Sequence, residues 1–326
     1  MTERATLNQI TQVGVETTPG NEAAANKLLQ ALTISPGIAV DVSRFRPAGG
    51  KFTTLAALGK EWVDARIEGQ GCYNHLAYLF SSVLSFASPV KQGSTDAYKW
   101  TFTPAHSAAD TIKTFTVEQG SDARAGKFTY GLVTQVGLRI DRSGVAVTGA
   151  MIGQAYQDGI SMTGSPTAVD AQPIQPTEVD IYLDDTGTGI GTTKLARALR
   201  AEFEIGDRYA PVWPLNSAID GFAAHVETAP TASLRLLVEA DQEGMGLLSA
   251  MRAGAKRFVR LLATGPIIAY TYHYKLALDV CGVVAEVSEF SDEDGVYGIE
   301  WTLDVAYDAT WQKALTVELV NTVSAL

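Results

Sequence analysis

The sequence predicts a mainly β protein made of two tandem β-sandwich domains, each with one flanking α-helix. Its 326 residues are long for one domain and comfortable for two. A hairpin-like stretch occurs twice, as RIDRSGVAVTGAMIGQAYQD (139–158) and FSDEDGVYGIEWTLDVAYDA (290–309). Between them lies MTGSPTAVDAQPIQPT (162–177), which has the Pro/Gly/Ser/Thr composition of a linker. We therefore expect a first domain with an N-terminal arm (1–160), a linker (161–180) and a second domain with a C-terminal arm (181–326).

The two hairpins share a frame. In each, an Asp stands three residues before a Gly that is expected to form the turn. An Ala-Tyr pair follows, and its Tyr lies 12 residues after that Gly in both copies (156 − 144 = 12 and 307 − 295 = 12). The framing residues are Asp141, Gly144 and Tyr156 in the first copy, and Asp292, Gly295 and Tyr307 in the second.

Other segments recur in the same order. Each half begins with an extended run, a Thr/Gly-rich turn and a Lys-Leu-led helical or extended segment, VGVETTPGNEAAANKLLQAL (13–32) and IYLDDTGTGIGTTKLARAL (181–199). An Arg-x-x-Pro stretch follows in each, at Arg44 and at Arg208. Next come a strand and a helix with apolar residues at helical spacing, expected at Tyr73–Phe86 and Gln242–Ala255. Chance similarity of β-rich segments is the alternative, but the shared order favours an internal duplication.

Composition and charge exclude several classes of protein. The chain is 46% hydrophobic and 19% charged, as expected for a folded protein with real cores. Residues 1–170 hold 14 basic and 14 acidic side chains, so the remainder holds 25 − 14 = 11 basic and 36 − 14 = 22 acidic ones and carries the whole net charge of −11. A protein that grips nucleic acid needs clustered Lys and Arg, so that role is not expected. No segment resembles a signal peptide or a membrane span.

No catalytic motif is complete. GTGIGTTK (187–194) follows a strand-like run but lacks the Gly-Lys-Ser/Thr spacing of a phosphate loop, which predicts a flexible turn. GISMTG (159–164) misses the nucleophile-elbow spacing by one residue, and no neighbouring His or Asp supports Ser161. We expect no enzyme and no cofactor.

Metal sites are not expected either. Cys72 and Cys281 lie in different halves and form no disulfide framework. Cys72 and His75 are too few ligands for a metal, so we expect Cys72 to pack against a sheet and His75 to lie on the polar side of its helix. The other histidines, His106, His225 and His273, form no ligand-spaced cluster. Asp292–Gly295 lacks the further ligands of a calcium loop and predicts a solvated turn with Gly at positive φ.

The residues resemble a known family. The segments VGVETTPGNEAAANKLL, RFRPAGGKFTTLAALGKEWVDARIEGQGCYNHLAYLFSSVL and SDEDGVYGIEWTLDVAYDATWQKALTVELVN are similar to tail tube (major tail) proteins of long-tailed, siphovirus-type bacteriophages. The resemblance runs from about Val13 to Asn321 and lies in patterns of strands and turns. It implies a tube fold of two packed antiparallel sheets flanked by a helix, in a structural virion protein made in the host cytoplasm.

The resemblance also implies partners. Members with one tube domain form hexameric rings, and members with two form trimers with pseudo-sixfold symmetry. The rings stack into a tube whose lumen holds the tape-measure protein and then the passing DNA. Tail terminator and tail-tip proteins would contact its ends, and no membrane is involved.

Strand alternation suggests which residues face the lumen. In the second hairpin, Ile299, Trp301, Leu303, Val305 and Tyr307 point one way, and Glu300, Thr302, Asp304, Ala306 and Asp308 point the other. Eight carboxylates and no Lys or Arg lie between Glu286 and Asp308. A wall for DNA in transit should be neutral or negative, so we expect Glu300, Thr302, Asp304 and Asp308 to line the lumen. The alternative is that these carboxylates face outward and keep the protein soluble.

Two segments are too long for tight turns. We expect AGGKFTTLAALG (48–59) and VWPLNSAIDG (212–221), together with the arms Met1–Gln12 and Trp311–Leu326, to bridge successive rings. The candidate contact residues are Gly49, Gly50, Lys51, Phe52, Trp213 and Asn216. The alternative is that they are mobile surface loops.

The rival functions are a carbohydrate-binding or adhesive β-sandwich, another phage tail component, and an enzyme. A sugar-binding module would expose a platform of aromatic side chains. Trp62, Trp100 and Trp301 lie in alternating strands, where burial is expected, and Trp213, flanked by prolines, is the aromatic that would be exposed.

Overall fold

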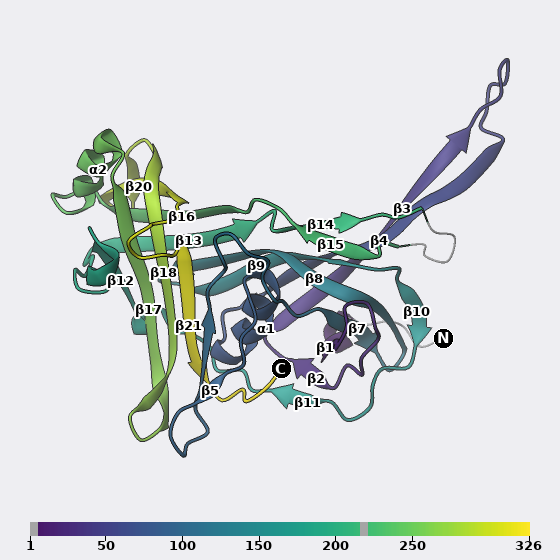
Figure 1. Ribbon diagram of the computed structural model, residues 1–326, viewed down its shortest axis with the longest axis horizontal. Coiled ribbons are helices and arrows are strands. Elements are labelled where there is room, and N and C mark those ends of the chain that lie inside the picture. Colours follow the sequence, from purple (N-terminus) through teal and green to yellow (C-terminus); the bar gives the residue numbers. More distant parts are fainter. Residues whose placement is uncertain (1–5, 216–220) are drawn as a thin grey trace.

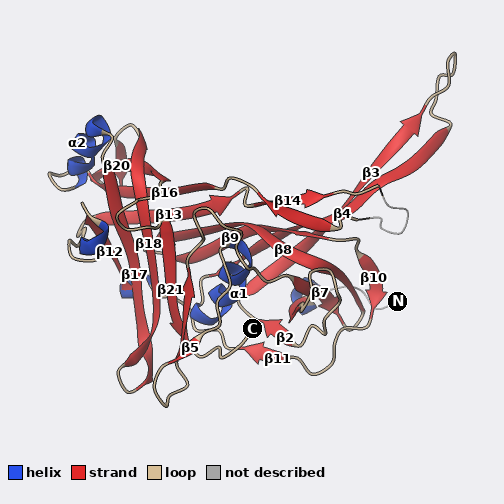
Figure 2. Cartoon of the chain, viewed as in Figure 1, coloured by secondary structure: helices blue, strands red, loops and turns tan. Residues whose placement is uncertain are grey.

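The computed structural model describes residues 6–215 and 221–326. It is 56% strand and 9% helical, which confirms the expectation of a mainly β protein (Figures 1 and 2). Among the described residues, nineteen strands belong to one hydrogen-bonded network and β14 pairs separately with β15. One long hairpin projects from the body (Figure 1).

The first half contains the longer of the two α-helices, α1. Its strands and helices are η1 (Thr6–Asn8), β1 (Ile10–Val15), β2 (Lys27–Leu29), β3 (Leu32–Phe45), β4 (Leu55–Gln70), α1 (Tyr73–Val83), β5 (Val90–Lys91), β6 (Tyr98–Phe102), β7 (Phe115–Ser121), β8 (Arg124–Asp141), β9 (Gly144–Gly153), β10 (Gln157–Ile160) and β11 (Thr167–Val169).

The second half begins with a one-turn helix. Its elements are η2 (Pro176–Glu178), β12 (Val179–Asp184), η3 (Gly187–Gly189), β13 (Ala198–Gly206), β14 (Tyr209–Val212), β15 (Ala224–Glu227), β16 (Thr231–Glu239), η4 (Gly244–Gly246), α2 (Leu247–Ala253), β17 (Lys256–Ala269), β18 (Tyr272–Val287), β19 (Ser291–Glu293), β20 (Val296–Val305) and β21 (Leu315–Asn321).

Strand pairing follows the same order in both halves. The first half pairs β3, β4, β9 and the end of β8 into one antiparallel sheet, and the second pairs β13, β16, β20 and the end of β18. Both β8 and β18 have a bulge in their pairing with β9 and β20, and their N-terminal parts belong to a second sheet. There β8 pairs with β7 and β10, and β18 pairs with β17 and β21. A strand that bends at a bulge can serve two packed sheets, which gives each half its sandwich character.

The two four-stranded sheets are joined edge to edge. The end of β8 pairs with β13 from Val136↔Ile205 to Asp141↔Arg200, and this pairing is called the inner junction. The result is one eight-stranded sheet in the order β3-β4-β9-β8-β13-β16-β20-β18, with β3 at one edge and β18–β19 at the other.

The core lies under this sheet and around α1. All eleven residues of α1 are buried, and the helix contacts β8 of the first half and β6, β18 and β21 (Figure 1). The large buried side chains include Phe80, Trp100, Phe102 and Trp301. Trp100 and Trp301 are fully buried, as predicted, whereas Trp62 is only half-buried. α1 ends three residues earlier than expected, and α2 is a short helix preceded by a 3-10 turn.

The predicted alignment of the two hairpins, which matched Gly144 with Gly295, is wrong by one residue. The β8–β9 turn is closed by Asp141↔Gly144, whereas the β19–β20 turn is closed by Glu293↔Val296. Asp294 and Gly295 both have positive φ, 54° and 87°, as a type I′ turn requires. Gly295 is therefore a turn residue, while Gly144 is the first residue after its turn, and the two copies align from their closing pairs rather than from their glycines.

Two segments expected to be loops or arms are strands. Leu55–Gly59 belongs to β4, and the β3–β4 hairpin extends well beyond the body (Figure 1). The expected C-terminal arm contains β21, which pairs with β18 on one side and β6 on the other. Its alternating sequence LTVELVN is buried except for the part-buried Glu318, so the segment is held inside the sheet. The trailing Asn321 accepts a hydrogen bond from the Trp100 indole N–H at 3.1 Å.

The segment between the halves is also ordered. β11 pairs in parallel with β2, and Pro173 forms an isolated bridge with Cys72. The linker thus lies along the first half rather than standing free. Among the described residues, no helix has the length and apolar character needed to cross a bilayer.

Candidate functional site

The eight-stranded sheet has one polar face, here called the open face. Residues directly opposite one another in paired strands share a face, so the register places a set of polar side chains on it, interrupted by the buried Leu237 between Arg200 and Glu300. The set includes Asp64, Arg66, Gln135, Arg139, Thr148, Arg200, Glu202, Glu204, Arg235, Glu300, Thr302 and Asp304. The opposite face of the same strands carries the buried core.

Three of the predicted lumen residues lie together on the open face. Glu300, Thr302 and Asp304 alternate along β20 with the buried Ile299, Trp301 and Leu303. The expectation for Asp308 assumed that the strand continues, but β20 ends at Val305. Asp308 instead accepts hydrogen bonds from the backbone N–H groups of Thr310 and Trp311 in the following turn, at 3.0 and 2.7 Å. These backbone donors, with burial opposing them and Lys256 assisting, lower the pKa of Asp308.

The centre of the open face is a ladder of ion pairs. Glu202 lies within 3.5 Å of Arg139 and 3.3 Å of Arg200, and at 3.9 Å from Arg235. Arg200 also pairs with Glu300 at 2.5 Å. The inner junction therefore has cations on both strands, and Glu300 is neutralised. Asp304 is exposed and makes no ion pair among the described residues.

Both outer edges of the sheet expose apolar side chains. At the β3 edge and its hairpin these are Ile38, Val40, Val42 and Leu58, with exposed fractions of 58, 46, 38 and 55%. At the β18–β19 edge they are Val287, Phe290 and Tyr297, of which the last two stack with ring centroids 4.6 Å apart. Contiguous exposed apolar surface beside unpaired strand edges is typical of an interaction surface.

The predicted contact residues fall into three groups. Gly49, Gly50, Lys51 and Phe52 lie at the tip of the β3–β4 hairpin, where Phe52 is 80% exposed. Trp213 is not a free loop residue, because it packs edge-on against Trp62 and Phe222 and lies under the Lys60 ammonium. Asn216 lies outside the described residues, and so do Met1–Ala5. The expectation of a free Met1–Gln12 arm is wrong for Ile10–Gln12, which belong to β1 and pair with β7.

The glycine-rich loop after β12 encloses a carboxylate of its own chain. The Asp184 carboxylate accepts hydrogen bonds from the N–H groups of Gly191, Thr192 and Thr193 and from the Thr192 hydroxyl, at 2.7 to 3.2 Å. Burial opposes ionisation, but these donors outweigh it and lower the pKa of Asp184. The backbone donors that a phosphate would need are already used. The loop is therefore a hydrogen-bonded turn rather than the flexible one that the sequence predicted.

The predicted position of His75 is wrong. His75 is not on a polar helix face but fully buried, where its Nε2 accepts from the backbone N–H groups of Gln30 and Ala31 at 3.2 and 3.4 Å. Burial lowers the pKa of His75 to about 4, with Asp170 opposing the shift. Cys72 is buried, and burial together with Asp170 raises the pKa of its thiol to about 11. Over residues 6–215 and 221–326, no group of three His, Cys, Asp or Glu side chains could hold a metal.

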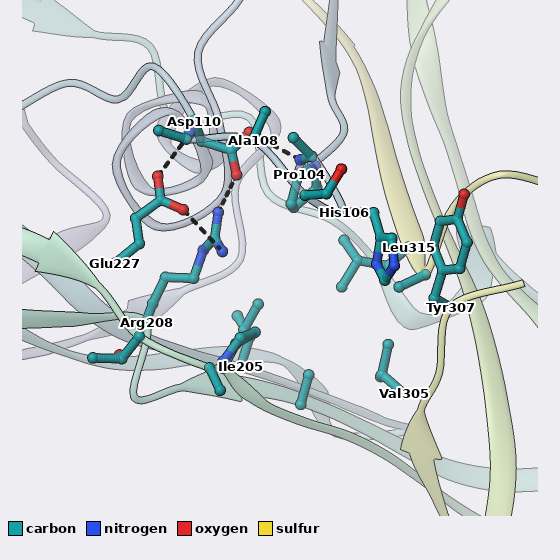
Figure 3. A pocket seen from close by; sticks show the side chains of 18 of the residues that line it. Pro104, His106, Ala108, Asp110, Ile205, Arg208, Glu227, Val305, Tyr307 and Leu315 are labelled. Carbon is teal, nitrogen blue, oxygen red and sulfur yellow. Dashed lines mark hydrogen bonds and ion pairs between the residues drawn. The ribbon is translucent and has the colours of Figure 1, made fainter.

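A cavity of about 800 Å³ lies where the two halves meet (Figure 3). One wall is the strap Pro104–Asp110 of the first half, and the other includes Ile205, Glu227 and Leu315 of the second. His106 of the strap stacks on Tyr307, with ring centroids 3.7 Å apart. Tyr307 therefore lies beyond β20 at the cavity wall rather than on the expected core face of the strand.

One arginine holds the strap in place. Arg208 pairs with Asp110, and both side chains are 5% exposed. Its guanidinium also donates to the carbonyls of Val83 and Leu84 at the end of α1, at 3.2 and 3.0 Å. A cation at a helix C-terminus satisfies carbonyls that have no partner within the helix. Sequence reasoning noted Arg208 only as part of a repeated motif, and its partners are too distant in sequence to be found from that motif.

No protein-family model matches the chain, and no curated protein matches it either.

Proposed function

We propose that the chain is a structural subunit of a phage tail tube, as the resemblance implies, and that it has no enzymatic role. The observation that carries the proposal is the repeated pairing order, in which two sandwich-like halves join edge to edge through the inner junction. A chain built this way has two free strand edges. They are of the same two kinds as the edges that pair with each other in the inner junction. Copies joined head to tail would continue the sheet, and a closed ring would leave no free edge.

On this proposal the open face lines the central channel. It holds ion pairs at its centre and the unpaired Asp304 near the second half's edge, so duplex DNA would meet a wall that does not bind phosphates. Six sandwich units would close the ring, and a chain with two units would supply them with three copies. The projecting β3–β4 hairpin, with Phe52 exposed and Lys51 beside it, is suited to contact a copy in the next ring.

The tryptophans argue against the sugar-binding alternative. Trp100 and Trp301 are fully buried, and Trp62 and Trp213 pack against each other at 5.7 Å between ring centroids. These four residues offer no flat aromatic platform to a carbohydrate ring.

Negative-stain microscopy of the purified chain tests the proposal. We expect rings or tubes with a central hole, and native mass measurement of single rings should give three chains. Monomers under every salt, pH and concentration condition would overturn the tube function. Rings of six chains would retain it and refute the pairing of two units per chain.

A further inference from the structure

The inner junction shows how two edges of this chain fit together. Three apolar pairs span it on the core side, Val136–Ile205, Leu138–Phe203 and Ile140–Ala201. All six side chains are at most 7% exposed. On the open side the Arg139–Glu202 and Arg200–Glu202 ion pairs cover the same strands.

Strand register relates each outer edge to one side of this junction. Five residues after the turn-closing Gly144 and Val296 come Gly149 and Trp301 (149 − 144 = 5, 301 − 296 = 5), which therefore correspond. Their partners across β8 and β18 are Val136 and Val287, which makes Val287 the counterpart of Val136.

The opposite edge follows by the same count. From Gly149 the ladder leads across β4 to Ile34 on β3, and from Trp301 it leads across β16 to Ala201 on β13. Ile34 is thus the counterpart of Ala201. In the same register Thr33, Ser35 and Ile38 correspond to Arg200, Glu202 and Ile205.

We propose that β3 of one copy pairs with β18–β19 of the next in the register of the inner junction, and that ionic strength controls this outer junction because its carboxylates lack arginine partners. This inference rests on the proposed tube function. It places Ile38 opposite Val287, Ser35 opposite Ser291 and Thr33 opposite Glu293. Between Val287 and Ser291 the chain has one residue more than between Val136 and Arg139, and this extra residue forms a bulge beside Phe290.

The apolar pair supports the register. Ile38 and Val287 are 58% and 39% exposed in the single chain, whereas their counterparts Ile205 and Val136 are 1% and 0% exposed. In the proposed register Ile38 and Val287 pack against each other, so each covers the exposed surface of the other. The same register also places Phe290 near Pro36, at the position where the inner junction packs Leu138 against Phe203.

The charges of the two junctions differ. Ser291 and Ser35 replace Arg139 and Glu202, and Thr33 replaces Arg200, so no cation stands at these positions of the two edge strands. Glu286, Glu289, Asp292 and Glu293 lie along the β18–β19 edge, with Asp292 and Glu293 on opposite faces of the sheet. Among the described residues none of the four makes an ion pair. Each approaching chain also carries a net charge of −11. Added salt shortens the range of this repulsion to about 10 Å at 0.1 M, and the apolar pairing can then hold.

The test restores the missing ion pair. The critical concentration for assembly of the full-length chain is measured by sedimentation from about 0.02 to 0.5 M NaCl. We expect wild type to assemble more readily as salt rises. The double variant S35E/S291R, which recreates the Glu202–Arg139 pair across the outer junction, should assemble at low salt at a two- to fivefold lower critical concentration, roughly the effect of one exposed ion pair. The like-charge variant S35R/S291R is the matched control and should assemble less readily than S35E/S291R at low salt.

The outcomes separate this inference from the tube function. If wild type assembles but S35E/S291R and S35R/S291R have equal critical concentrations, the proposed register is wrong and the tube function stands. If wild-type assembly weakens as salt rises, control by carboxylate repulsion is wrong. If wild type forms no ring or tube at all, the tube function itself fails. Thermal unfolding of each variant as a monomer confirms that the substitutions leave the fold intact.

Discussion

Replacing Arg208 with Met should loosen the contact between the two halves. The substitution keeps an unbranched side chain of similar length but removes the guanidinium, so the carboxylate of Asp110 is left buried with the Ala105 N–H as its hydrogen-bond donor at 2.9 Å. The carbonyls of Val83 and Leu84 lose their donors as well. Breaking a buried ion pair by removing one partner costs about 3–5 kcal/mol, much of it from the charge left unpaired.

Urea unfolding of the monomeric chain, followed by tryptophan fluorescence, measures this cost. The control is Arg235→Met, because Arg235 is half exposed and lies 3.9 Å from Glu202, where an ion pair contributes about 0–1 kcal/mol. A second variant, R208M/D110L, removes both charges and should be more stable than R208M alone. A loss below about 1 kcal/mol for R208M, or no recovery in the double variant, would refute the reasoning. Limited proteolysis should also cut R208M within Pro104–Asp110 faster than wild type.

Burial, surface charge and the projecting hairpin lead to three more predictions. The folded-state pKa of His75 is about 4, below its ordinary value, so protonation favours unfolding. Stability should be fully present above about pH 6.5 and fall by up to ~1.4 kcal/mol per pH unit towards pH 4, and His75→Gln should remove this component from the pH profile. Asp304→Lys should permit tubes but slow DNA ejection, while the control Asp96→Lys on an exposed loop should not; equal ejection rates would remove the electrostatic role of the open face. Replacing Ala48–Thr53 by Asn-Gly should leave folded chains that form rings but not long tubes, and tubes of normal length would exclude the hairpin tip as the contact between rings.

Sequence patterns predicted the features that depend on local alternation. The two faces of β20 were predicted correctly from Ile299 to Asp304, because a strand with one buried face must alternate. The burial of Trp100 and Trp301 followed from the same rule. The assignment of residues to strand faces failed where strands end. Asp308 continues the alternation in sequence, but backbone N–H groups of the next turn hold its carboxylate.

Other features depend on long-range pairing that the sequence does not display. β21 would be an exposed arm if β6, more than 200 residues earlier in the chain, did not supply its second neighbour. His75 shares its helix with apolar residues, and nothing local shows that both faces of α1 are covered. The two hairpin turns differ by one residue because Asp294 and Gly295 together adopt the left-handed conformation, whereas the first turn uses Arg142 and Ser143. A comparison anchored on the glycines therefore assigns residues to the wrong faces.

The difference between the two junctions gives a reason for placing the acidic residues in one half. The inner junction forms within one chain, where the linker keeps both edges at high effective concentration, so its ion pairs can form at any protein concentration. The proposed outer junction would form between chains, and a long exposed edge that paired too readily would aggregate before assembly begins. On this proposal the carboxylates at the β18–β19 edge, which make no ion pair among the described residues, would limit such pairing, as charged edge residues do in other sheets. The S35E/S291R chain should therefore be recovered from the producing cell with a smaller soluble monomer fraction than wild type, as measured by size-exclusion chromatography of the clarified lysate. An equal monomer fraction would mean that these carboxylates do not restrain pairing in the cell.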